Sequence, residues 1–235
     1  MSAAQFFIGV ILPYITVVVF IVGIVYRIKK WNKAPVGKMT LFSAPATPSE
    51  KWKQILKEVL VFKQLFDGNK SLWAGTWIFH AALLLIIVGH SRVVTDFPLL
   101  WGALGMSNAN VDTMSNVVGG AAGVIVLAMG IYLLVRRLVV TRVAEISDTE
   151  DYVCLGLILA IVISGDILRF GPHFDLDLSR QYFAGLLTFQ GGPVPSNAWF
   201  LLHLFLGQIL IMYVPFSKFL HIPGIFYSKS LIYQR

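Results

Sequence analysis

Five stretches of the chain are apolar and long enough to cross a membrane as helices, which takes about 20 residues each. Apart from Asp166 in the fourth, these windows contain no Asp, Glu, Lys or Arg. The last uncharged window, residues 181–217, is too long for one helix, and the segment "GGPVPSN" with its two prolines divides it. The pattern therefore predicts spans at about residues 6–26, 71–91, 113–135, 152–168 and 197–217.

A different pattern lies between the first two spans. Residues 50–66 place apolar side chains at helical spacing on a basic segment, which is typical of an amphipathic helix with Ser49 as its expected N-cap. Such a helix lies on the membrane surface or docks a partner. Its apolar stripe consists of Trp52, Ile55, Leu56, Val59, Leu60, Phe62 and Phe66.

The composition excludes several classes of protein. Hydrophobic residues make up 57% of the 235 residues and charged residues 13%, whereas a soluble domain usually has about 25% charged residues. The single cysteine, Cys154, excludes an internal disulfide framework and a cysteine-ligated iron–sulfur cluster or zinc ribbon. The absence of C-x-x-C-H excludes a covalently attached c-type haem. We expect an all-α fold, an integral membrane five-helix bundle that forms one domain over residues 1–235.

The distribution of basic residues predicts the orientation. Sixteen of the 19 Lys and Arg residues fall in segment 27–70, in the loop after the third span, or in the C-terminal tail. The positive-inside rule puts these segments on the cytoplasmic side. We therefore expect the N-terminus outside, the C-terminus in the cytoplasm, and a multi-pass protein of the cytoplasmic membrane. The net charge of +7 is then explained by the basic residues of the cytoplasmic segments, so nucleic acid is not an expected partner.

Four of the five histidines lie in or at the ends of two spans. His80 and His90 belong to the second span, and His203 and His221 to the fifth. Ionisable residues inside a membrane are functional candidates, although a single histidine there can simply hydrogen-bond to a neighbouring helix. Two histidines on each of two helices suit the axial ligation of b-type haem, which takes one imidazole from each face of the ring.

The topology pairs these histidines. The second and fifth spans run in opposite directions, so His90 pairs with His203 near the outside and His80 with His221 near the inside. The ten residues from His80 to His90 correspond to about 15 Å of helix. The eighteen residues from His203 to His221 correspond to about 27 Å, or five whole turns that would put both side chains on one face. The two lengths differ by about 12 Å, and helix tilt, the breadth of the haem ring and a bend near Pro215 are expected to absorb part of this difference.

Three segments resemble a known family. "FHAALLLIIVGH" (79–90), "GGAAGVIVLAMGIYLLVRRL" (119–138) and "LHLFLGQILIMYVPFSKFLHI" (202–222) are similar to the gamma subunit of respiratory nitrate reductase and its relatives. The resemblance runs from about Trp73 to the C-terminus. It implies a cytochrome b with two haem b groups that oxidises quinol and passes electrons inward. The histidine pairing that the resemblance implies is the one that the topology gives.

Two features depart from the nitrate reductase subunit. That subunit has a lysine associated with quinol in the outer loop after the second span, whereas this chain has no lysine between Lys70 and Lys218. In the N-terminal part, "PYITVVVFIVGIVYRIKKW" (13–31) and "MTLFSAPATPSEKW" (39–52) are more similar to the cytochrome b subunit of the sulfite-reductase-associated membrane complex. This resemblance implies menaquinone and a cytoplasmic iron–sulfur protein resembling heterodisulfide reductase as partners. A nitrate reductase gamma subunit and a methanogen heterodisulfide reductase cytochrome remain alternatives.

Other polar residues near the outer histidines are candidates for cofactor contacts. Arg169 or Arg92 would pair with haem propionates, and Asp166 would take protons from quinol, unless Asp166 and Arg169 form a structural ion pair. Gly89 would let a haem edge or a neighbouring helix approach closely. His173, in an outer loop with Asp175 and Asp177, is interpreted as a solvated residue rather than a metal ligand.

The sequence therefore predicts an electron-transfer subunit of a membrane complex, working between menaquinone and an iron–sulfur subunit in respiratory sulfur metabolism. The chain shows no substrate chemistry beyond quinone oxidation and reduction. A rival from another class is a transporter whose membrane histidines relay protons or bind metal. Against that rival, the chain lacks paired broken-helix repeats, and its membrane histidines sit on only two helices.

Overall fold

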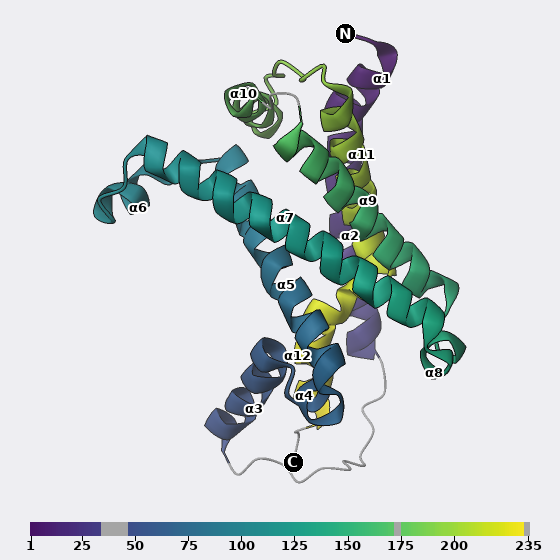
Figure 1. The fold of residues 1–235 in the computed structure, drawn as a ribbon. Coiled ribbons are helices and arrows are strands. Elements are labelled where there is room, and N and C mark those ends of the chain that lie inside the picture. Colours follow the sequence, from purple (N-terminus) through teal and green to yellow (C-terminus); the bar gives the residue numbers. More distant parts are fainter. Residues whose placement is uncertain (34–46, 172–174, 233–235) are drawn as a thin grey trace.

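The computed structural model describes residues 1–33, 47–171 and 175–232, and this part of the chain is helical without a strand. Five of its helices are long and apolar enough to cross a membrane (Figure 1), which confirms the all-α class and the predicted number of spans. They are α1–η1–α2 (Ala3–Lys33), α5–η2 (Lys70–Val93), α7 (Asn108–Val139), α9 (Thr149–Phe170) and α11–η3 (Ala198–Phe216).

Shorter helices lie at the two ends of the bundle. The N-terminus and α10 (Leu176–Leu187) are at the upper end of Figure 1, and α6 (Pro98–Ala103) projects to one side beside the start of α7. The segments predicted to be cytoplasmic gather at the other end. These are α3 (Pro48–Val61), α4 (Lys63–Gly68), α8 (Thr141–Glu145) and α12 (His221–Ile232), which follows the short turn η4 (Lys218–Leu220).

Side-chain caps fix where the membrane helices begin. Ser107 accepts a hydrogen bond from the backbone N–H of Asn110 at the start of α7, and Asn197 caps α11 in the same way. Asp148 forms a reciprocal capping box with Asp151 at the start of α9. Because hydrogen bonding in a helix does not stop at the edge of the hydrocarbon, four of the five helices run beyond the charge-free windows, α7 from residue 108 to 139.

The long helices pack as a row in the order α5, α7, α9, α11, α2. Phe79 of α5, Val126 of α7 and Val162 of α9 belong to one buried cluster, while Leu168, Tyr182 and Phe200 form a second cluster between α9, α10 and α11. Helix α5 carries His80 and His90, and α11 carries His203, so these histidine-bearing helices are not consecutive in the row. α7 and α9 connect them.

The first span contains a π-helical turn, η1 (Phe7–Ile11). The wider turn changes the pattern of backbone hydrogen bonds. Two carbonyl groups there accept side-chain hydrogen bonds from other elements: Ile8 O from Gln208 Nε2 at 3.0 Å, and Gly9 O from the Tyr182 hydroxyl at 2.7 Å. These bonds tie the N-terminal span to α10 and α11.

The amphipathic helix differs from the sequence expectation in two respects. Its N-cap is Thr47, not Ser49, because Thr47 and Glu50 form a capping box around Pro48 at the first helical position. The segment is also not one helix. Phe62 adopts a left-handed conformation (φ 52°) and separates α3 from α4.

Candidate functional site

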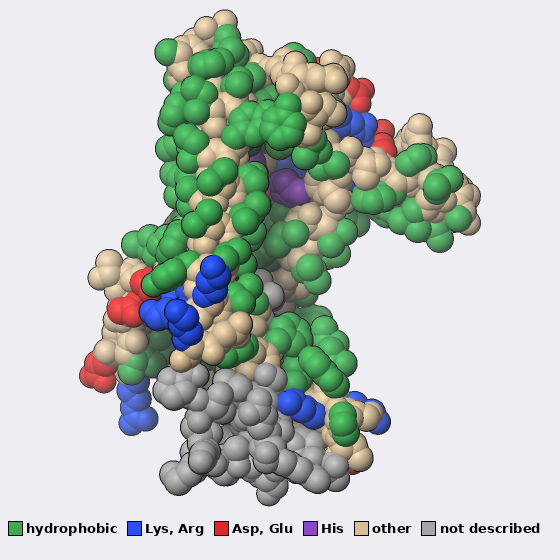
Figure 2. Space-filling view, turned by 180° about the vertical axis from the view of Figure 1, so that it is seen from behind, with side chains coloured by type: hydrophobic (Ala, Val, Ile, Leu, Met, Phe, Trp, Pro, Cys, Tyr) green, Lys and Arg blue, Asp and Glu red, His purple; other side chains and the backbone are tan. Residues whose placement is uncertain are grey.

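The structure brings His90 and His203 together near the end of the bundle that holds the N-terminus, which is the end predicted to face outside. His90 is the last residue of α5, and His203 lies in the second turn of α11. Their ring centroids are 6.0 Å apart, and the ring planes are nearly parallel at 18°. In Figure 2, histidine side chains (purple) are visible between the hydrophobic surfaces of neighbouring helices.

His80 and His221 form a second pair toward the other end. Their ring centroids are also 6.0 Å apart, but the ring planes cross at 87°. The expectation that a single helix places His203 and His221 on one face is wrong, because α11 ends at Tyr213. The chain then passes through η3 and η4, with extended backbone at Ser217, so the eighteen residues do not measure a helical rise. This break removes the mismatch in length that a continuous helix would create.

Each of the four histidines uses its Nδ1 atom in the same way. The Nδ1 atoms of His80, His90 and His221 lie 2.7–2.9 Å from the carbonyl oxygens of Thr76, Ile86 and Lys218, respectively. A carbonyl oxygen only accepts hydrogen bonds, so Nδ1 carries the proton and Nε2 keeps a free lone pair. This is the tautomer that a metal-ligating histidine needs.

His203 is held by α9. Its Nδ1 lies 3.1 Å from the Ile161 carbonyl oxygen and 3.0 Å from the hydroxyl of Ser164, which donates its own proton to Ile161. Ser164 is 1% exposed, so these bonds form in a dry environment. Gly165 lets the ring approach the helix: a Cβ atom at this position would lie 3.0 Å from His203 Cε1.

The distance between the two imidazoles of each pair fits a metal ion at the centre of a planar ring, with one imidazole bound on each face. Metal–imidazole bonds of about 2 Å place two opposed nitrogens about 4 Å apart and the ring centroids about 6 Å apart. Both pairs have this spacing. The donor set is chemically suitable as well, because each pair presents two Nε2 lone pairs and no competing thiolate or carboxylate ligand. Among the described residues no cluster of three or more His, Cys, Asp or Glu forms a separate metal site.

The candidate propionate partners differ in availability. Arg92 is buried and donates to Asp96 at 2.6 Å and to Asp112 at 2.8 Å, so two carboxylates already neutralise its guanidinium. The hydrogen bond from Arg92 holds the pKa of Asp96 below its usual range. Arg169 donates to the side-chain oxygen of Asn116 at 2.9 Å. An anionic group from a cofactor would therefore meet less competition at Arg169 than at Arg92.

Asp166 and Arg169 face α7 at two glycines. A Cβ atom at Gly119 would lie 2.8 Å from Arg169, and one at Gly123 would collide with the Asp166 carboxylate. Asp166 Oδ2 is buried and has no hydrogen-bond partner in the part of the chain that the structure describes. Among the described residues Asp166 and Arg169 do not form the close ion pair that is the alternative to a functional role, and the carboxylate keeps Oδ2 as a free acceptor.

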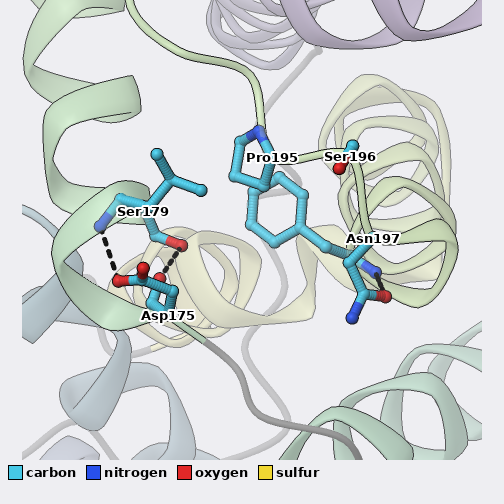
Figure 3. A pocket seen from close by; sticks show the side chains of 7 residues that line it. Asp175, Ser179, Pro195, Ser196 and Asn197 are labelled. Carbon is cyan, nitrogen blue, oxygen red and sulfur yellow. Dashed lines mark hydrogen bonds between the residues drawn. The ribbon is translucent and has the colours of Figure 1, made fainter.

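Two further sequence candidates have simpler outcomes. Gly89 is exposed, and a Cβ built there would meet no atom of another element within 4 Å, so this position lies on open surface. His173 lies outside the residues that the structure describes. Asp175, from the same loop, caps α10 and lines a small pocket with Ser179, Pro195 and Asn197 (Figure 3).

Lys218 is not a candidate by sequence, yet it supports the inner pair. Its Nζ donates to Asp148 at 2.8 Å and to Asp151 at 2.9 Å, and its backbone N–H donates to Glu150 at 2.7 Å. The hydrogen bond from Lys218 lowers the pKa of Asp148, and the two aspartates raise the pKa of Lys218. Since the Lys218 carbonyl holds His221, this clamp fixes the inner histidine to the start of α9.

The fold and these four residues define a class: a multi-pass helical membrane protein with two histidine pairs at different levels of the bundle, three of the histidines on spans and His221 just beyond the fifth span. The chain belongs to the nitrate reductase gamma subunit family, whose model matches residues 63–234.

Relatives from three kinds of complex are similar to almost the whole chain. It is 30% identical to the Hdr-like menaquinol oxidoreductase cytochrome b-like subunit of Archaeoglobus fulgidus, over 94% of this chain and 78% of that protein. Identity to the nitrate reductase gamma chain of Bacillus subtilis is 24%, over 96% of this chain and 95% of that one. Identity to a component of the dihydromethanophenazine:CoB–CoM heterodisulfide reductase of Methanosarcina thermophila is 24%, over 92% of this chain and 87% of that one.

Proposed function

We propose that this chain is the membrane cytochrome b subunit of a quinol-oxidising complex, with one haem b held by His90 and His203 and a second by His80 and His221. The observation that carries the proposal is the pair of imidazoles at each depth, with ring centroids 6.0 Å apart and each Nδ1 hydrogen-bonded, which leaves Nε2 as the nitrogen to bind a metal. Bound haem supplies a centre that accepts and gives up one electron at a time. The two pairs, about 15 Å apart along α5, make a path across the membrane.

The quinone contacts in this proposal lie at the outer pair. Menaquinol that loses two electrons also releases two protons, and Asp166 has a free carboxylate oxygen to receive a proton. Arg169 pairs with a propionate, and the open surface at Gly89 admits the edge of the ring system. The menaquinol oxidoreductase relatives support menaquinone as the quinone.

The orientation follows from charge. Placing the segments that hold most of the Lys and Arg residues in the cytoplasm obeys the positive-inside rule, and the blue side chains in Figure 2 are mostly in its lower half. The N-terminus is then outside, and the protein resides in the cytoplasmic membrane. Protons from quinol are released outside, so electron flow toward the cytoplasm conserves energy.

The electron partner in this proposal is an iron–sulfur protein of the heterodisulfide reductase type, in a complex of respiratory sulfur metabolism. The exposed face of α3 is suited to an acidic partner surface, because it combines exposed Leu56 and Leu60 with Lys53 and Lys57. The Hdr-like relatives support this partner. A gamma subunit of nitrate reductase is the second candidate, favoured by the gamma chains of similar length.

The haem content of the purified protein tests the proposal. We expect two haem b per chain, measured as the ratio of pyridine haemochrome to protein, with an α-band that appears on reduction. A transporter that uses the same histidines for protons would contain no haem. One haem per chain in a fully loaded, intact preparation would contradict the assignment of two pairs.

Substituting Gly165 with alanine is expected to weaken the outer haem site alone. The new methyl group would lie 3.0 Å from the His203 ring, so the imidazole has to move. Gly156→Ala on the same helix is the matched control, because a Cβ there meets no atom within 4 Å. We expect a lower haem-to-protein ratio for Gly165→Ala and an unchanged ratio for Gly156→Ala. Equal ratios in both variants would show that the approach of α9 to His203 is unimportant.

A further inference from the structure

Phe62, between α3 and α4, adopts a backbone conformation that bulky residues avoid. Its φ is 52°, in the left-handed region that favours glycine or asparagine. A residue of this kind stays in such a conformation only where its surroundings hold it there. The position of its side chain therefore has a structural cause elsewhere in the fold.

Two tryptophans of α5 hold the turn. The indole N–H of Trp73 donates to the Val61 carbonyl oxygen at 2.7 Å, and that of Trp77 donates to the Leu60 carbonyl oxygen at 2.9 Å. These are unpaired carbonyls at the C-terminal end of α3. From the sequence alone, both tryptophans are expected to anchor the protein at the membrane interface. The structure gives them a second role as caps that attach α3 to the second span.

The attachment brings the Phe62 ring onto a histidine of the inner pair. The centroids of the Phe62 and His80 rings are 5.2 Å apart, and the planes meet at 88°. Phe79 makes a similar edge contact with His80, at 5.4 Å and 75°. His80 is thus confined by two aromatic rings, and its own plane crosses that of His221 at 87°.

We propose that Phe62 is a positioning residue, which keeps the His80 imidazole crossed with the His221 imidazole. The inference rests on the proposed binding of haem by the two histidine pairs. The bond from Nδ1 to Thr76 fixes one point of the His80 ring, and the edge contact with Phe62 limits rotation about that point. Removing the Phe62 ring leaves Phe79 as the one remaining aromatic contact described for His80 apart from His221, so the His80 ring gains room to turn about its bond to Thr76.

Ring orientation has a spectroscopic signature that overall stability does not affect. An axial imidazole interacts with the iron d orbital perpendicular to its own plane. Two parallel rings act on the same orbital and separate the two π-type d orbitals in energy, whereas crossed rings act on both and leave them nearly equal. Near-equal orbitals make the EPR signal of low-spin ferric haem more anisotropic. The 87° pair is therefore expected to give a larger highest g value than the 18° pair.

Phe62→Gly tests the proposal in the full-length, haem-loaded protein. Glycine tolerates positive φ, so this variant removes the ring and relieves the backbone at once. We expect the highest g value of the inner signal to decrease toward that of the outer signal, while the outer signal stays unchanged. Phe62→Tyr keeps the ring edge and should keep the wild-type spectrum. Phe189→Gly is the control, since Phe189 also has a positive φ (58°) but stacks on Tyr14 instead.

An unchanged inner signal in Phe62→Gly, with two haems bound, would overturn the proposal. If that variant binds fewer than two haems, Phe62→Leu replaces it, because leucine fills the space without an aromatic edge, and an unchanged inner signal there is equally decisive. The haem content of the wild-type protein is measured first. Fewer than two haems at that stage would contradict the proposed function itself, so the two failures are distinguishable.

Discussion

Replacing His90 with alanine is expected to reduce the haem content from two to one and to abolish quinol-driven reduction of the haem that remains. His203 alone cannot supply both axial ligands of the outer haem. The inner haem keeps both of its proposed ligands, His80 and His221. It lies about 15 Å along the helix from the proposed quinone site. The measurements are the haem-to-protein ratio and the rate at which a menaquinol analogue reduces the α-band in isolated membranes.

His173→Ala is a suitable control for this variant, because it also removes a histidine but not one of the four predicted ligands. It should retain two haems and a normal rate. If His90→Ala lost one haem and still showed quinol-driven reduction at the wild-type rate, quinone would have to react at the inner pair. The assignment of Asp166 and Arg169 to the quinone end of the path would then be wrong.

Replacing His221 with alanine should separate the two halves of the path. The outer pair and the residues around it are unchanged, so quinol should still reduce the outer haem in a single fast phase. Electrons should no longer reach the inner face. In inverted membrane vesicles, which expose that face, quinol-dependent reduction of added ferricyanide should fall by orders of magnitude, because the remaining centre lies far from the surface.

A methionine at position 221 provides the matching rescue. Methionine pairs with histidine as an axial ligand in other haem proteins, so His221→Met should restore the second haem, with a raised midpoint potential, and part of the ferricyanide rate. Undiminished ferricyanide reduction in His221→Ala would mean that electrons leave the protein without passing His80 and His221. The inner pair would then have another role.

The sequence predicts the number of spans well, because charge-free length is set by the thickness of the hydrocarbon. It does not predict where the helices end. Arg136 and Arg137 close an apolar window, yet they lie inside α7, since a charged side chain at the membrane surface leaves the backbone hydrogen bonds of a helix intact. The predicted N-cap of α3, Ser49, lies two residues after the observed one, Thr47, because the prediction relied on hydrophobic periodicity. Thr47, Pro48 and Glu50 form a local signal that hydrophobic periodicity does not contain.

The histidine pairing is also predictable, because antiparallel spans leave a single sensible match in depth. The support around each pair is not. Lys218, Ser164 and Phe62 reach the histidines through contacts between residues far apart in the chain, or through a left-handed turn, and neither leaves a periodic pattern. Pro215 predicts that the helix breaks after Tyr213. The extended backbone at Ser217 is not predictable in this way, because the next residue, Lys218, is hydrogen-bonded to Glu150 at the start of α9.

The π-helical turn at Phe7–Ile11 bears on how the first span can change in evolution. Such a turn accommodates about one residue more than the matching stretch of α-helix. Deleting one residue there would restore a regular helix without shifting Leu12–Lys33 in register. The carbonyls that now face Gln208 and Tyr182 would turn back into the helix, and both side chains would lose their acceptors. Descendants that lose the residue should therefore also change positions 182 and 208.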